Sequence, residues 1–101
     1  MRVQTRIVWR DRHYALRGIF AIEFREVDGG IVLATHRQLP VHGHGSSQEE
    51  AIEAFCEAFD LQWRSLVEVD ETSLTSGGRD RRRAMQAAAE RVTIGEPLKG
   101  R

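Results

Sequence analysis

The 101-residue chain is long enough for one domain with a modest hydrophobic core and too short for two. Hydrophobic residues make up 41% of it, and no run approaches the ~20 apolar residues that span a bilayer. Fifteen basic residues balance fifteen acidic ones, so overall charge gives no argument for nucleic-acid binding. The N-terminal region has scattered charges instead of a signal peptide's apolar run, and Cys56 is the single cysteine. We therefore expect a cytoplasmic protein in a reducing compartment.

The first 17 residues predict one strand and the beginning of another. Apolar and polar residues alternate from Val3 to Trp9, as in a strand with one buried face. A charged break at 10–13 interrupts this pattern. The segment 14–17 then leads past Gly18 into a second strand.

A β-hairpin is the best-supported part of the predicted sheet. The run 19–27 is rich in aromatic and β-branched residues, and 28–30 is an Asp-Gly-Gly sequence that accepts the positive φ of a tight turn. Apolar side chains of the first run share one face: Phe20, Ile22 and Phe24. The run 31–39 returns, Pro40 ends it, and a Gly-rich loop follows at 41–45. A three-stranded antiparallel sheet with one apolar face results, which suits coverage by a helix on one side.

The strongest helix prediction covers 47–66. Ser47 and Glu50 have the spacing of a capping box, and Ser46 and Glu49 offer the same box one residue earlier. Apolar residues recur at spacings of three and four and form one broad stripe: Ile52, Phe55, Cys56, Phe59, Trp63 and Leu66. We expect this helix, with Trp63 in its core, to cover the apolar face of the sheet.

The remainder of the chain predicts a smaller second helix. A polar connector at 67–78 leads to an Ala-rich helix at 79–92, and 93–101 contains helix breakers and is expected to be frayed. The predicted fold class is α+β, a three-stranded antiparallel sheet packed on one long helix with a short C-terminal helix. The sheet and long helix occupy 1–70, and 71–101 adds a connector, a short helix and a tail to the same domain.

The order of hairpin, Gly-rich loop and capped helix resembles the HicB-like family of small antitoxin domains. The matching segments are 20–34, Leu39-Pro40, Gly45, Ser46-Ser47 and Glu49-Glu50-Ala51. The resemblance covers about half of the chain, and the loop departs from it by carrying Val41-His42 where the family more often has a Gly-Cys pair. It implies a fold like a trimmed ribonuclease H or double-stranded-RNA-binding domain. It also implies a role in masking a small toxin ribonuclease, or else an orphan domain of the same family that binds another partner.

Antitoxins of this family commonly add a C-terminal DNA-binding module, but 67–101 predicts only one helix, so DNA binding is not carried over. The chain is expected to be a non-catalytic domain that binds a small protein such as a toxin ribonuclease, with no cofactor, metal or catalytic residue assigned. The acidic helix front suits a basic partner surface: Glu49, Glu50, Glu53, Glu57 and Asp60. The alternative is a weak RNA-binding or nuclease-like module that uses the sheet and the basic cluster Arg79, Arg81, Arg82 and Arg83.

Other candidate chemistry has simpler structural interpretations. His42 and His44, with His36 nearby, suggest a metal site, but no Cys or carboxylate has zinc-like spacing beside them. The helix glutamates lie along one element, whereas metal-dependent nucleases gather carboxylates from several elements. Cys56 falls mid-helix on the apolar side, where an inert buried thiol is expected. Asp80 interrupts the basic cluster and no aromatic residue interleaves it, which indicates a solvated helix start.

We also expect a homodimer. One helix covers only one face of the sheet, edge strands keep unpaired backbone groups, and the HicB-like resemblance implies frequent dimers. The outer strands carry Ile7, Trp9 and Leu33, apolar side chains that a second copy would cover through sheet-edge pairing or a helix contact.

Overall fold

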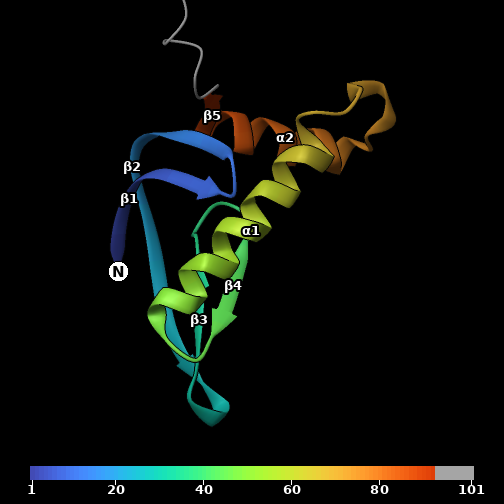
Figure 1. Ribbon diagram of the computed structural model, residues 1–101. Coiled ribbons are helices and arrows are strands. Elements are labelled where there is room, and N and C mark those ends of the chain that lie inside the picture. Colours follow the sequence, from blue (N-terminus) through green and yellow to red (C-terminus); the bar gives the residue numbers. More distant parts are fainter. Residues whose placement is uncertain (93–101) are drawn as a thin grey trace, which may run out of the picture.

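The computed structural model describes residues 1–92, which form an α+β fold with an antiparallel sheet and two helices, as predicted (Figure 1). The elements are β1 (Arg2–Trp9), β2 (Arg12–Val27), β3 (Ile31–Thr35), β4 (His42–Gly45), α1 (Gln48–Leu66), α2 (Ser76–Ala88) and β5 (Ala89–Val92), with short 3-10 turns at Asp28–Gly30 and Glu71–Ser73. The sheet has five strands, ordered β1-β2-β3-β4 with β5 also on β2. The prediction of three strands is wrong because it missed the two four-residue strands β4 and β5.

Strand β2 is the longest strand and pairs with three others. β1 lies along one edge of it, which confirms the first predicted strand and the continuation past Gly18. On the opposite edge, β5 pairs with 13–16 and β3 pairs with 23–27. Between these partners, the segment 17–22 has no strand beside it on that edge within residues 1–92.

A wide bulge interrupts the pairing of β1 with β2. The register shifts so that 16–19 of β2 lie opposite Thr5 of β1. Gly18 has a φ of +60°, a conformation that L side chains rarely adopt, so glycine permits this distortion. The next residue, Ile19, is 86% exposed, and the bulge therefore presents a large apolar side chain to solvent.

The predicted hairpin between β2 and β3 is confirmed. Gly29 and Gly30 have φ values of 77° and 76° in the turn. The predicted return strand, 31–39, is too long, because β3 ends at Thr35. The chain then leaves the sheet and turns back, and this path buries Leu39 in the core.

The predicted Gly-rich loop is mostly strand β4. Alternate residues of a strand share a face, and Gly43 and Gly45 face α1. A Cβ at Gly43 would lie 2.2 Å from the backbone nitrogen of Phe55, and one at Gly45 would lie 2.4 Å from the Cβ of Glu50. Glycine usually weakens a strand, but here it lets the backbones of β4 and α1 approach closely.

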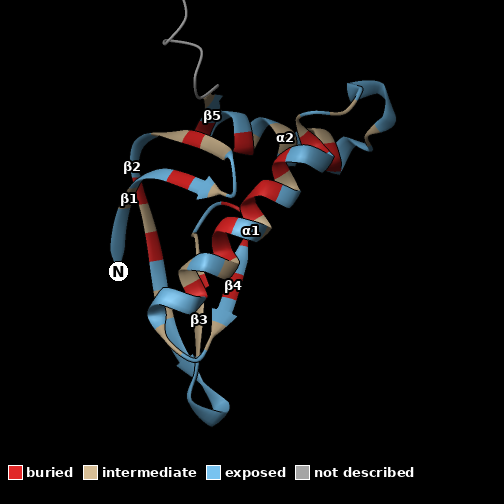
Figure 2. Cartoon of the chain, viewed as in Figure 1, coloured by how far each residue is buried: buried red, intermediate tan, exposed pale blue. Residues whose placement is uncertain are grey.

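Helix α1 confirms the predicted long helix. Ser47 is its N-cap, and the Ser47 hydroxyl oxygen accepts a hydrogen bond from the backbone N–H of Glu50 at 3.2 Å. The second hydrogen bond of the predicted capping box, from the backbone N–H of Ser47 to the Glu50 carboxylate, does not form. The Glu50 carboxylate instead accepts hydrogen bonds from the backbone N–H and the hydroxyl of Ser46. Figure 2 shows the buried side of α1 facing the sheet. The predicted stripe is buried, apart from the half-buried Ile52.

Aromatic rings form the centre of the core between α1 and β2. Phe59 lies 5.2 Å from Tyr14 and 6.2 Å from both Phe20 and Trp63, measured between ring centroids. Phe55 contacts Phe20 at 6.2 Å. The apolar side chains that alternate along β2 therefore pack against α1, as the sequence predicts. Trp63 is a core residue, also as predicted.

The second helix differs from its prediction at both ends. α2 begins at Ser76, earlier than predicted, because the hydroxyl of Thr75 accepts the backbone N–H of Gly78 at 3.0 Å and caps it. The predicted last turn is strand β5, whose pairing with β2 buries Ala89. The predicted frayed tail, 93–101, lies outside the described residues.

Gly43→Ala is expected to lower the free energy of unfolding by about 3 kcal/mol, because the added methyl group overlaps the backbone of α1. Gly77→Ala is the matched control. A Cβ at Gly77 has no neighbour nearer than 3.8 Å, so this change should be neutral or stabilise by up to about 1 kcal/mol. Urea unfolding measures both values. If Gly43→Ala is as stable as the unmodified protein, β4 does not pack on α1 as described.

Candidate functional site

The solvent side of α1 carries a line of exposed residues spaced four apart: Glu49, Glu53, Glu57 and Leu61. Residues at this spacing are neighbours on a helix surface. Glu49 approaches Arg2 only at 4.0 Å, and within residues 1–92 no ion pair involves Glu53 or Glu57. Leu61 is 53% exposed. We call this line the acidic ridge, since it presents three exposed carboxylates to solvent and ends in an apolar side chain.

Glu50 belongs to the predicted acidic front but not to the ridge. Its carboxylate accepts hydrogen bonds from the backbone N–H and hydroxyl of Ser46, at 2.9 and 2.7 Å. These bonds hold the pKa of Glu50 below its ordinary value. Glu50 therefore fixes the start of α1.

Asp60, the last residue of the predicted acidic front, is fully buried. Its Oδ1 accepts hydrogen bonds from the Tyr14 hydroxyl and from Nε of Arg12, both at 2.5 Å. Nη2 of Arg64 lies 3.1 Å from Oδ2, an ion-pair contact without hydrogen-bond geometry. The carboxylate is therefore neutralised by two arginines that come from β2 and α1.

From the buried Asp60 the network extends to β5 through two exposed side chains, Glu68 and Arg91. Arg12 also binds Glu68 at 2.7 Å, and Glu68 contacts Arg91 at 3.3 Å. Burial raises the pKa of Tyr14, and the hydrogen bond to Asp60 raises it further. Burial lowers the pKa of Arg12, but its hydrogen bonds to Asp60 and Glu68 outweigh this and leave the pKa above its ordinary value. Tyr14 is therefore a neutral donor and Arg12 a permanent cation.

The sequence pattern placed Asp60 on the acidic front of the helix, and its burial was missed. Asp60 instead pairs with Arg64 one turn later on α1 and with Arg12 of β2. A signal existed, because Asp60 lies at helical spacing from Cys56 and Trp63 and so falls on the buried stripe. A carboxylate at such a position requires partners from elsewhere in the chain.

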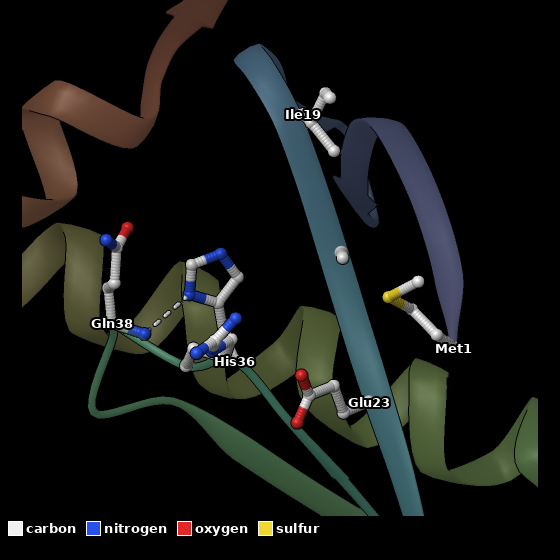
Figure 3. Close-up of a pocket in the computed structure, with 7 residues that line it drawn as sticks. Met1, Ile19, Glu23, His36 and Gln38 are labelled. Carbon is white, nitrogen blue, oxygen red and sulfur yellow. Dashed lines mark hydrogen bonds between the residues drawn. The ribbon is translucent and has the colours of Figure 1, made fainter.

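The opposite side of the sheet contains a hollow of about 630 Å³ (Figure 3). Its lining residues are Met1, Ile19, Ala21, Glu23, His36, Arg37 and Gln38. A second hollow of about 320 Å³ shares Ile19, His36 and Gln38 with it and extends to the alanines of α2. Both adjoin the segment 17–22 of β2, the part that lacks a strand partner on one edge.

His36 lines both hollows and has a packing role. Its ring stacks on Phe20 with centroids 4.3 Å apart, and its Nδ1 accepts the backbone N–H of Gln38 at 3.1 Å. Burial lowers the pKa of His36, and the charge of Glu23 opposes this in part. The imidazole is therefore neutral at neutral pH.

The structure does not assemble the histidines into a metal site. His42 and His44 are exposed on β4, on the side away from α1, while His36 stacks on Phe20. Within residues 1–92 no three His, Cys, Asp or Glu side chains are placed to hold a metal ion.

Cys56 is buried, and burial raises its pKa above the ordinary value, which disfavours the thiolate.

The basic cluster of α2 is largely engaged within the protein. Nη1 of Arg82 donates to the carbonyls of Leu66 and Val69, at 3.0 and 3.1 Å, and so caps the end of α1. Arg79 donates to the carbonyl of Leu74 at 2.9 Å. Arg83 pairs with Asp80, and Arg81 is exposed. The arginines mainly secure the connector between the helices.

Comparison of the chain with family models, curated proteins and solved structures finds no match. Within residues 1–92, neither helix combines the length and the apolar character that crossing a membrane requires.

Asp60→Ala is expected to lower the free energy of unfolding by about 3–5 kcal/mol, because it removes the buried carboxylate that pairs with the half-buried Arg12 and accepts the hydrogen bond of the buried Tyr14. Arg64→Ala removes a half-exposed partner and should cost about 1 kcal/mol or less. Urea unfolding of the two variants gives the comparison. Equal, small losses would mean that the carboxylate is solvated and the network is not buried.

Proposed function

We propose that the chain is a non-catalytic domain that binds a small basic protein through the acidic ridge of α1. The observation that carries the proposal is the ridge itself, in which three exposed carboxylates lie in line with an exposed leucine and two of them, Glu53 and Glu57, have no ion-pair partner within residues 1–92. The HicB-like resemblance supports the kind of partner, a small toxin ribonuclease. Such an enzyme binds RNA and therefore carries a basic surface.

The ridge has the size and the chemistry of a protein contact. Its ends, Glu49 and Leu61, are twelve positions apart, and at 1.5 Å per residue the ridge extends roughly 18 Å along the helix. Its carboxylates would steer a basic surface into contact, and Leu61 would supply an apolar anchor. Inhibition would follow from occlusion, because a ribonuclease whose basic surface lies on α1 cannot bind RNA.

An RNA-binding function has less support. It would use the basic cluster, but three of its four arginines already bind carbonyl groups or Asp80. Base stacking would need accessible aromatic rings, and five of the seven aromatic side chains are buried in the core: Tyr14, Phe20, Phe55, Phe59 and Trp63.

Affinity capture from native lysate tests the proposed partner. The tagged protein is expected to retain a small basic protein, and Glu53→Gln/Glu57→Gln should lose most of it because the ridge loses two charges. Glu26→Gln/Glu71→Gln removes the same charge from exposed sites outside α1 and is the matched control. Raising the salt concentration should release the partner.

Equal capture by both double variants would contradict a role for the ridge. Recovery of RNA without a protein, lost on mutation of Arg81, would favour the RNA-binding alternative instead.

Incubation of the purified protein with structured RNA and Mg²⁺ or Mn²⁺ is expected to give no cleavage. The carboxylates of the ridge lie along one helix, and among residues 1–92 they do not converge with metal-ligating side chains from other elements. Gel analysis of the RNA provides the measurement. Cleavage that disappears in Glu53→Gln or Glu57→Gln would overturn the non-catalytic assignment.

A further inference from the structure

Large apolar side chains are exposed together on the side of the sheet away from α1. Ile19 is 86% exposed, Met1 83% and Val3 55%. Val3 pairs with Ala21 across the strands, and Met1, Ile19 and Ala21 line the larger hollow (Figure 3). These four residues form one apolar surface, which we call the sheet patch.

No described element covers the sheet patch. Helix α1 occupies the other face, since the side chains that alternate with those of the patch, such as Phe20 and Ile22, are buried beneath it. Exposed apolar side chains that gather around a hollow are typical of interaction surfaces. Ile19 directly follows Gly18, whose φ of +60° distorts the strand at this point. The exposure of Ile19 therefore follows from the backbone conformation.

The residues first expected to drive dimerisation do not form this surface. Ile7 has no exposed area, because it pairs with Tyr14 on the face that α1 covers. Trp9 is half-buried and packs against the core, and Leu33 is half-buried in the sheet. The apolar side chains that need a cover are therefore those of the sheet patch.

We propose that the sheet patch is a self-association surface on which a second copy of the chain docks across a two-fold axis. A two-fold contact is self-complementary, so one patch must carry both members of any charge pair. Glu23 and Arg37 both line the hollow, and within residues 1–92 neither has an ion-pair partner. In the dimer, Glu23 of each copy faces Arg37 of the other around the central contact of Ile19 and Val3.

A second copy fits this surface better than a strongly charged partner. The chain carries 15 basic and 15 acidic residues, so two copies do not repel each other. The patch lies on the opposite side of the sheet from the acidic ridge, and the proposal does not depend on the proposed function.

Light scattering after size exclusion at micromolar concentration is expected to give twice the 11.5 kDa mass of one chain. Ile19→Asp should weaken the dimer at least about tenfold, because it places carboxylates in the desolvated centre of the contact. Leu61→Asp changes a comparably exposed residue on α1 and should leave the dimer unchanged. Circular dichroism checks that both variants are folded. A monomeric unmodified protein, or a dimer that folded Ile19→Asp leaves intact, would overturn the proposal.

A charge exchange tests the two-fold arrangement independently of folding. Glu23→Arg and Arg37→Glu should each weaken the dimer, because each places like charges together. The double variant Glu23→Arg/Arg37→Glu should recover most of the loss. A double variant as weak as the worse single variant would overturn the assigned pairing.

Discussion

The close contact between α1 and β4 determines the arrangement of the rest of the molecule. At Gly43 the two backbones approach so closely that a methyl group cannot fit between them. This contact, with the aromatic core on β2, holds the helix flat against one face of the sheet. Because the chain has a single long helix, the opposite face remains without a covering element among residues 1–92.

Two surfaces with different chemistry result from this one-sided packing. The acidic ridge lies on the solvent side of α1, and the sheet patch lies beyond the strands, so one molecule can use both at once. A network centred on the buried Asp60 connects α1 to β2 through Arg12 and, through Glu68 and Arg91, to β5. It fixes the relative position of the elements that carry the two surfaces. We therefore regard it as a structural network.

Local signals in the sequence predicted the elements that depend on neighbouring residues. The Asp-Gly-Gly hairpin, the apolar stripe of α1 and its Ser47 cap all followed from spacing and turn chemistry. The errors arose where distant contacts decide the outcome. The glycines at 43 and 45 predicted a loop, but they form a strand because they allow β4 to pack closely on α1. The residues predicted to end α2 form β5 instead, because they pair with an edge of β2. Asp60 needed partners 46 and 48 residues away.

Site-specific photo-crosslinking in cells tests the central claim that opposite faces of this domain serve different partners. A photoreactive amino acid is placed at position 19, in the sheet patch, or at position 57, on the acidic ridge, and the adducts are identified by mass spectrometry. The account predicts a crosslink to a second copy of the chain at position 19 and to a small basic protein at position 57. The same adduct at both positions, or a second copy only at position 57, would contradict it.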